Sequence, residues 1–259
     1  MSKLRVLDLF SGIGGFSLGL ERTGGFSTVA FCEIEPFPRK VLAKHWPEVP
    51  QYEDVKQLTS DILQRDGISV DVITGGFPCQ DISVAGNQAG IGSETRSGLW
   101  SECKRLVGEL RPRYAIFENV TNLLSGPSEQ PGGWFSRILS DLAEIGYDAE
   151  WENIPAESVG APHPRNRVWI IAYPERTRRE GLITNDLLSG SKREAYPIPC
   201  NAGPVKWCEL ASNSAFIRDG NGLPVKMERD RLKGLGNAVV PQIPQLIGQA
   251  ILDAEKAAP

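Results

Sequence analysis

The sequence is poor in the residues that build metal centres and disulfide frameworks. It has two histidines and five cysteines among 259 residues, and no two cysteines form a C-x-x-C pair. So few histidines argue against a zinc cluster, and an odd number of cysteines without paired spacing argues against a disulfide scaffold. We therefore predict no bound metal and a reducing, intracellular environment.

Long apolar runs are also absent. No segment approaches the roughly 20 apolar residues of a membrane-spanning helix, and the N-terminus has no signal-peptide pattern. Apolar residues make up 41% and charged residues 23% of the chain, as in globular proteins that fold in water. We expect a cytoplasmic protein that forms one large domain, or one domain with a small appendage.

The charge is uneven along the chain. A net charge of −4 argues mildly against nucleic acid as a partner, but it is an average. Between positions 161 and 206 there are eight Lys or Arg and four Asp or Glu, and five more basic residues follow by position 233. A solvated surface explains this bias, and so does a phosphate-binding surface on one part of an acidic protein.

Strand and helix patterns alternate through the first two-thirds of the chain. Apolar runs suited to buried parallel strands occur at 4–9, 28–32, 70–74, 114–117 and 168–173, and a further strand is expected near 147–154. Helical periodicity occurs at 15–22, 37–44, 55–65, 98–110 and 134–145. This alternation predicts an α/β fold with a doubly wound, mostly parallel sheet, whose ligands bind at the carboxyl ends of the strands.

The pattern breaks in residues 174–230. Charge runs and scattered Gly and Pro replace clean periodicity there, and we interpret the segment as a small, irregular second domain. Regularity then returns, and an apolar stripe at helical spacing runs through 243–251. We expect residues 1–173 and 231–259 to form one domain, with the C-terminal helix packed on the sheet.

A strand runs into a glycine-rich turn and a helix at Asp8–Phe16. Gly12, Gly14 and Gly15 allow a ligand to approach the backbone closely, and the helix N-terminus favours an anionic group. Glu33 follows the second strand about twenty residues later, a spacing at which an acid binds ribose hydroxyls. The turn alone could be a tight connection. With the acid it predicts a nucleoside cofactor, and both NAD and S-adenosylmethionine fit.

Cys79 stands out among the cysteines. It ends the tetrad Gly76–Cys79, is followed by Gln80, and comes after the predicted strand at 70–74 in a turn that presents its side chain. A lone cysteine is usually buried as a small hydrophobe. The Gly/Pro turn and the polar, glycine-rich stretch that follows favour a reactive thiol equally well.

Charged residues also flank two other predicted strands. Glu118 follows a buried strand and should lie at the same sheet edge as Cys79, where burial could raise its pKa and make it a proton donor. Arg165 and Arg167, spaced i and i+2 before a strand, would point the same way. A loop acid and solubilising edge-strand arginines are the alternative interpretations. Gly234–Pro241 by itself predicts only a turn that enters the last helix.

Together these segments resemble the DNA cytosine-5 methyltransferase family. Nearly the whole chain outside 174–230 takes part, and the motifs occur in the family's order. DLFSGIGGF is similar to the first cofactor motif, GGFPCQDIS to the catalytic-cysteine motif, and ENV, the Arg-x-Arg pair and GNAVVP to later motifs. The resemblance implies a Rossmann-like, S-adenosylmethionine-dependent methyltransferase fold in which 174–230 is a short target-recognition region.

The resemblance also implies a role for each matching residue. Cys79 would add to C6 of a cytosine flipped out of double-stranded DNA, which prepares C5 to take the methyl group. Glu118 would hold N3 of the base, and Arg167, with Arg165, would hold O2. S-adenosyl-L-methionine, with S-adenosyl-L-homocysteine as its product, would contact Phe10, Gly12, Ile13, Gly14, Gly15, Glu33, Ile34, Asp54, Val55, Pro78, Leu99, Asn237 and Val239. A mobile loop at 81–97 would close over the base, and the residues expected to touch DNA or brace that loop are Gln80, Ser83 and Arg96.

One departure from the family pattern is His163, which stands where the family usually has glutamine two residues before its first arginine. Three other functions remain open: a tRNA-acting cytosine-5 methyltransferase, a catalytically weak DNA-binding relative, and an NAD-dependent oxidoreductase, which shares only the glycine turn and Glu33. We expect a monomer that acts on double-stranded DNA, does not bind membranes, is nucleoid-associated if bacterial or phage-encoded, and has a cognate restriction endonuclease as a candidate partner.

Overall fold

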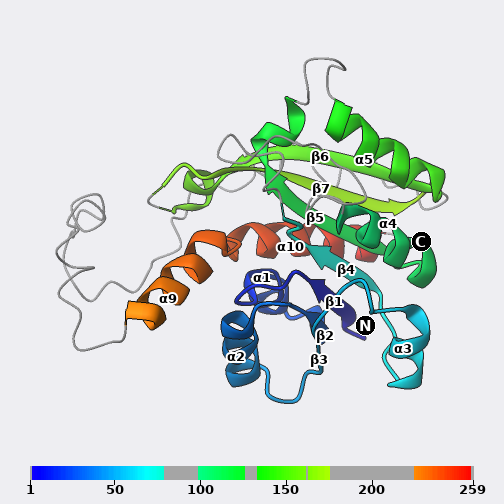
Figure 1. Cartoon of the computed structure of the whole chain (residues 1–259). Helices are drawn as coiled ribbons and strands as arrows, with labels where there is room; N and C mark the ends of the chain where they lie inside the picture. The colour runs from blue at the N-terminus through cyan, green and yellow to red at the C-terminus, as the bar shows by residue number, and fades with distance from the viewer. Residues whose placement is uncertain (1, 79–98, 126–132, 162, 176–224, 258–259) are drawn as a thin grey trace.

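The computed structural model describes residues 2–78, 99–125, 133–161, 163–175 and 225–257. Its strands are β1 (Leu4–Leu9), β2 (Phe26–Cys32), β3 (Gln51–Tyr52), β4 (Val72–Gly75), β5 (Tyr114–Val120), β6 (Tyr147–Pro155) and β7 (Asn166–Pro174). They form one sheet in the order β3-β2-β1-β4-β5-β7-β6 (Figure 1). Neighbouring strands from β3 to β5 are parallel, whereas β7 is antiparallel to both β5 and β6. The predicted α/β class with a mostly parallel sheet is confirmed.

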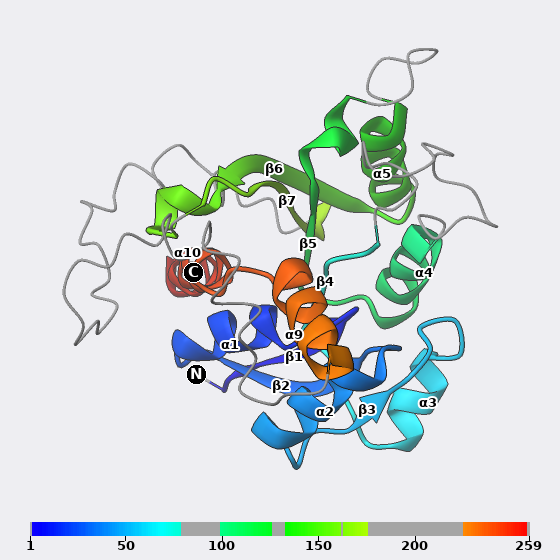
Figure 2. The same ribbon diagram turned by 60° about the vertical axis from the view of Figure 1, so that its left-hand side comes forward.

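Helices cover both faces of this sheet (Figure 2). The described α-helices are α1 (Gly15–Arg22), α2 (Pro36–His45), α3 (Ser60–Arg65), α4 (Trp100–Leu110), α5 (Gly133–Glu144), α9 (Val225–Asn237) and α10 (Gln242–Ala257), with 3-10 turns η2 (Thr121–Leu124) and η3 (Ala156–Val159). Buried side chains of α3, α4 and α5 form the core on one face, and those of α1 and α10 form it on the other. The predicted packing of the C-terminal helix on the sheet is therefore confirmed.

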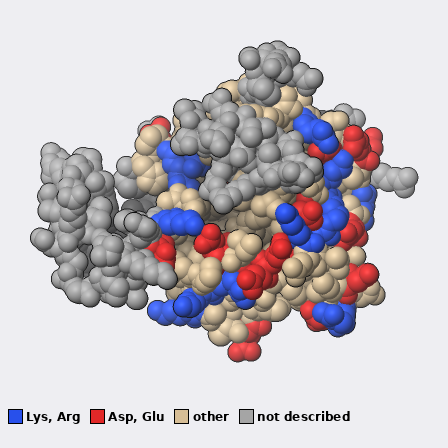
Figure 3. Space-filling model, viewed as in Figure 1, with Lys and Arg blue, Asp and Glu red and all other residues tan. Residues whose placement is uncertain are grey.

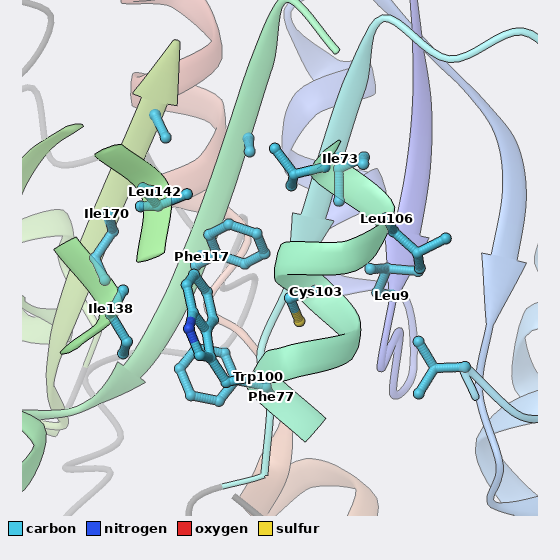
Figure 4. Close-up of a cluster of buried hydrophobic side chains, with 14 of the residues drawn as sticks. Leu9, Ile73, Phe77, Trp100, Cys103, Leu106, Phe117, Ile138, Leu142 and Ile170 are labelled. Atoms are coloured by element: carbon cyan, nitrogen blue, oxygen red, sulfur yellow. The ribbon is translucent and has the colours of Figure 1, made fainter. Parts of the chain in front are cut away.

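Aromatic packing fixes the turn that follows β4. The ring of Phe77 lies 5.3 Å from that of Trp100 and 6.4 Å from that of Phe117, and Trp100 also packs edge-on against Phe117 (Figure 4). The indole Nε1 of Trp100 donates to Asp141 of α5, so this buried ring is also satisfied as a donor. Phe77 therefore anchors the chain one residue before Pro78.

Close contact between α1 and α10 depends on residues without large side chains. A Cβ at Gly19 would lie 2.2 Å from the carbonyl oxygen of Pro241, and a Cβ at Gly248 would lie 2.9 Å from Leu20. Real Cβ atoms do not approach other atoms this closely, so the two helix backbones can meet only where glycine stands. Ile247 of α10 is buried in the core that this contact creates.

Three predictions of local structure are wrong. The strand expected at 168–173 is buried, but it is antiparallel rather than parallel. The helix expected at 55–65 begins only at Ser60, because the hydroxyl of Thr59 caps it by accepting a hydrogen bond from the amide of Ile62. The turn expected over Gly234–Pro241 is confined to 238–241, because the residues up to Asn237 belong to α9, which begins at Val225, before the predicted return of regularity at 231.

Several predictions concern residues outside the described part of the chain. These include most of the target-recognition region, so the boundaries at 174 and 230 stay predictions. No helix among the described residues is long and apolar enough to cross a membrane. The same residues hold no cluster of three or more His, Cys, Asp or Glu that could bind a metal ion.

Candidate functional site

Four of the parallel strands end in one row, and β5 continues past it to Val120, so Glu118 lies within β5 and not after it as predicted. The register aligns one residue of each strand across the sheet, in the order Tyr52, Cys32, Leu9, Gly75 and Phe117. The next residues along the chain are Glu53, Glu33, Phe10, Gly76 and Glu118. Because carboxyl ends of parallel strands share one edge of a sheet, the segments predicted for the cofactor and for the base lie along the same edge.

The glycine turn and Glu33 are tied together. Gly12 and Gly14 adopt φ of 53° and 86°, values that favour glycine, and Phe10 is also at a positive φ of 50°. The main-chain amide of Gly12 donates to Oε2 of Glu33 at 2.7 Å, and that of Glu35 donates to Oε1 at 2.8 Å. These bonds hold the nearly buried carboxylate beside the turn, and each oxygen retains capacity to accept from a ligand hydroxyl.

The surroundings of this turn fit a nucleoside cofactor. Among the described residues, no atom lies within 4 Å of where a Cβ on Gly12 would stand, so the backbone is open to close approach. Ile34 exposes 60% of its surface and offers an apolar contact for a flat base. Asp54 is partly buried, and its Oδ1 accepts from the amide of Lys56 at 2.9 Å, which orients the carboxyl group.

Two buried cysteines, Cys32 and Cys103, can be excluded as the nucleophile. Burial, with smaller contributions from the carboxylates of Glu33 and Asp54, raises the pKa of the Cys32 thiol to about 12. The carboxylates of Glu33 and Asp54 therefore both lie near Cys32, at the end of β2. Burial also raises the pKa of Cys103. Since the thiolate is the nucleophile, these two cysteines are inert core residues.

The junction between α9 and α10 covers the glycine turn. A Cβ on Gly15 would lie 2.5 Å from the carbonyl oxygen of Val239, so Val239 lies directly against the start of α1. The position of a Cβ on Gly234 is 3.5 Å from the side chain of Ile13. Asn237 is exposed at the end of α9. Two predicted cofactor residues from distant parts of the sequence, Gly15 and Val239, thus meet at one turn.

The remaining predicted cofactor residues differ in their burial. Pro78 and Leu99 are partly buried and flank the segment 79–98, which lies outside the described residues. Val55 is only 4% exposed and packs in the core, which leaves its main chain as the part able to meet a ligand. The roles of all three in cofactor binding stay predictions.

Glu118 and Arg167 form a pair at the same sheet edge. Nε of Arg167 lies 2.8 Å from Oε1 of Glu118, whose side chain is 12% exposed. Burial raises the pKa of Glu118, while the charges of Arg167 and Arg165 oppose that rise. A Cβ on Gly76 would stand 3.3 Å from Oε2 of Glu118, so this carboxyl also touches the turn after β4.

Asn119 is a site residue to which the sequence assigned no role. Its side chain is buried, and Nδ2 donates to the main-chain carbonyl of Phe77 at 3.3 Å. Its Oδ1 accepts from the amide of Val120 at 2.8 Å. Asn119 therefore ties β5 to the turn that leads to Pro78. The signal available in the sequence was a polar residue two positions after a run of buried strand residues.

Other predicted site residues are not brought together in this way. Nη1 of Arg165 donates to the main-chain carbonyl of Gly236, and no described contact joins it to Glu118 directly. Cys79 lies outside the described residues, as do three residues predicted to touch DNA or the loop, Gln80, Ser83 and Arg96. On the face shown in Figure 3, Lys and Arg are interspersed with Asp and Glu among the described residues. Most of the predicted basic segment, 176–206, is likewise not described.

Asp8 is a second residue that sequence reasoning missed. It is fully buried at the end of β1, where its carboxyl accepts from Thr74 of β4 at 2.7 Å and from Ser17 of α1 at 2.8 Å. These bonds join three elements directly beneath the glycine turn. Burial raises the pKa of Asp8 from 3.8 to about 7, although both hydrogen bonds oppose the rise.

We expect Asp8→Asn to remove a pH dependence of stability. The folded protein keeps a proton on Asp8 between pH 3.8 and about 7, whereas the unfolded chain releases it. The free energy of unfolding should therefore fall as pH rises through this window, by up to about 1.4 kcal/mol per pH unit. Urea unfolding of wild type and variant across this window measures the difference, and parallel curves would contradict the assignment.

The matching family model is that of the C-5 cytosine-specific DNA methylases, which covers residues 4–206. Among curated relatives, a type II methyltransferase of Staphylococcus aureus, M.Sau3AI, is 37% identical over 76% of this chain and 52% of its own length. The orphan methyltransferase M.SPRI of Bacillus phage SPR is 28% identical over 85% of this chain and 50% of its own. The chain spans about half the length of the curated relatives it matches.

Solved structures agree. A protein described as a DNA modification methyltransferase encoded within an Escherichia coli prophage is 30% identical, with a TM-score of 0.56 over 67% of this chain and 47% of that one. The Spodoptera frugiperda DNMT2 mutant is 21% identical, with a TM-score of 0.55 over 69% of this chain and 54% of its own, and shows the shared fold. The family model matches most of the chain, and the matched residues include the glycine turn, the ENV segment and the Arg-x-Arg pair. The chain therefore belongs to the C-5 cytosine-specific DNA methylase family.

Proposed function

We propose that this protein transfers a methyl group from S-adenosyl-L-methionine to C5 of cytosine in double-stranded DNA. The observation that carries the proposal is the pair formed by Glu118 and Arg167, 2.8 Å apart, at the sheet edge that also holds Glu33 and the glycine turn. A site that only binds a nucleoside has no need of a buried acid paired with arginine. An acid and a cation at this place could instead bind a second ring, that of the target base, and take part in a reaction on it.

The residues near the glycine turn would hold the cofactor. Glu33 would accept hydrogen bonds from ribose hydroxyls, Asp54 would meet the adenine amine, and the exposed side chain of Ile34 would pack on the adenine. Val239, pressed against Gly15, would close the other side of the turn. When bound, S-adenosylmethionine supplies an electrophilic methyl group.

The base-side residues would make cytosine reactive. C5 of cytosine is a poor nucleophile until a thiolate, here that of Cys79, adds to C6 and turns C5 into an enamine-like carbon. Glu118 would hold a proton at N3, so that the negative charge arriving on the ring is neutralised. The raised pKa of Glu118, caused by burial, supports this role because the donor must be protonated. Arg167 would orient the base through O2. After C5 takes the methyl group, loss of the C5 proton would expel the Cys79 thiolate from C6 and restore the aromatic ring.

DNA is the favoured substrate over tRNA because the curated relatives include type II and orphan methyltransferases and the matching family is defined on DNA. The basic bias from 161 to 206 supports contact with phosphates. We also propose that the protein is a cytoplasmic monomer located near the nucleoid. Its partner in a restriction–modification system would be a cognate restriction endonuclease.

The experiment compares the transfer of labelled methyl groups to duplex DNA and to tRNA, with the purified chain and S-adenosylmethionine. We expect 5-methylcytosine in DNA and none above background in tRNA, and bisulfite sequencing of the product DNA then gives the recognised site. Label in tRNA alone would favour the alternative of a tRNA-acting cytosine-5 methyltransferase. Tight, salt-sensitive DNA binding without methyl transfer would favour the catalytically weak DNA-binding relative. Binding of NAD instead of S-adenosylmethionine, measured by calorimetry, would favour the NAD-dependent oxidoreductase.

A further inference from the structure

One side chain connects the base side of the site with the cofactor side. Arg165 directly precedes β7, and its Nη1 donates a hydrogen bond to the main-chain carbonyl of Gly236 in the last turn of α9. The last carbonyls of a helix lack partners within the helix, and the helix dipole places partial negative charge there. A guanidinium at this point satisfies one such carbonyl and stabilises the end of α9.

The backbone of Arg165 is held in a conformation that non-glycine residues rarely adopt, with φ of 25°. The carbonyls of Pro164 and Arg165 both accept from the main-chain amide of Ala156, at 2.8 and 3.3 Å. These contacts fix the turn that sends the guanidinium toward α9. A strained conformation that persists because its neighbours impose it is characteristic of functional sites.

The end of α9 contacts the cofactor side. Gly234, two residues before the carbonyl that Arg165 holds, lies against Ile13, and Val239, three residues after that carbonyl, lies against Gly15. A shift of this helix end would therefore move groups that touch the glycine turn. α9 also contacts α2, since a Cβ on Gly234 would lie 3.3 Å from the ring of Phe37. An exposed ion pair joins Lys233 to Glu35, and exposed ion pairs add little stability.

Arg165 also neighbours the base side, because Arg167 follows it two residues later and its backbone pairs with Val120 of β5. Its positive charge works against the raised pKa of Glu118, and burial followed by the charge of Arg167 lowers the pKa of Arg165 itself. The three groups therefore share one electrostatic environment. Arg167 differs in its contacts, because its described partners are Glu118 and the carbonyl of Asn166 rather than α9.

We propose that Arg165 is a positioning residue that couples the glycine turn to the Glu118–Arg167 pair through the end of α9, rather than a second side chain that holds the base. The inference rests on the proposed function of the site. Coupling between two sites is reciprocal. A ligand that orders the glycine turn should therefore also order the Glu118–Arg167 pair, and a ligand that orders this pair should order the glycine turn.

The test compares Arg165→Met with Arg65→Met, two variants that each lose one guanidinium and keep an unbranched stem. Arg65 is exposed on α3, where it pairs with Asp66. Calorimetry without DNA gives the Kd for S-adenosylmethionine, and hydrogen exchange reports on the amides of 12–15 and 234–240. We expect Arg165→Met to raise the Kd about tenfold, as loss of a charge-assisted hydrogen bond does, and to speed exchange in both segments. Arg65→Met should leave the Kd within about twofold and exchange unchanged.

A second variant guards against a general loss of structure. Arg165→Lys keeps a donor and a charge but loses the planar guanidinium, so we expect values between wild type and Arg165→Met. Unchanged exchange and an unchanged Kd in Arg165→Met would overturn the coupling and return Arg165 to the base side. If wild type itself fails to bind S-adenosylmethionine, the proposed function falls, and exchange at 12–15 in Arg165→Met still decides the coupling.

Discussion

Replacing Cys79 with serine should abolish methyl transfer, with a loss of at least about a thousandfold, while cofactor affinity stays close to that of wild type. A serine hydroxyl has the size of the thiol but is far harder to ionise and much less nucleophilic toward C6. A free cysteine thiol has a pKa of about 8.5, so a modest lowering near cationic groups produces the thiolate at neutral pH. Single-turnover transfer to duplex DNA and calorimetry with S-adenosylmethionine measure the two effects.

The described cysteines provide the control. Cys103 is buried in the core, and Cys103→Ser should lower the free energy of unfolding without removing the ability to transfer methyl groups once the protein is folded. A further readout is the covalent complex, since wild type should form a denaturation-resistant adduct with DNA that carries 5-fluorocytosine at the target. Activity that survives in Cys79→Ser, or an adduct that persists, would exclude Cys79 as the nucleophile.

The elements that hold the site could be predicted because their sequence signals are local. The strand at Leu4–Leu9 and the helix at Gly15–Arg22 match the predicted bounds, since a buried apolar run and an apolar periodicity mark them directly. The direction of β7 could not be predicted in this way. A strand buried on both faces reads as the same apolar run whether its neighbours run parallel or antiparallel to it.

The contacts that join distant segments of the chain could not be predicted from the sequence, because no local pattern identifies the partner of each residue. Asp8 and Asn119 sit inside matching motifs, but nothing in their spacing shows that one binds Thr74 and the other the carbonyl of Phe77. The bond from Arg165 to Gly236 spans 71 residues and depends on where α9 ends, which the glycines at 234 and 236 obscured. Glycine is unfavourable within a helix, so the sequence pattern favoured a turn where packing enforces a helix.

Replacing Glu118 with glutamine should lower the rate of methyl transfer by about a hundredfold or more, the usual contribution of a general acid. Glutamine keeps the shape and can still donate a hydrogen bond, but it cannot deliver a proton to N3. Because burial raises the pKa of Glu118, wild type retains the proton to higher pH than a free glutamate does, and its activity should fall as pH rises through that pKa. The variant should lack this descending limb of the pH profile.

The same comparison separates proton donation from simple loss of the ion pair with Arg167. Glu144→Gln removes an exposed carboxyl that pairs with Lys104 on the outer helices, and we expect it to leave rate and pH profile unchanged. Glu118→Asp keeps a titratable group and should keep a descending limb even if shorter reach slows the reaction. A Glu118→Gln enzyme whose pH profile keeps the wild-type shape would show that Glu118 only orients the base and Arg167, and that the proton at N3 comes from elsewhere.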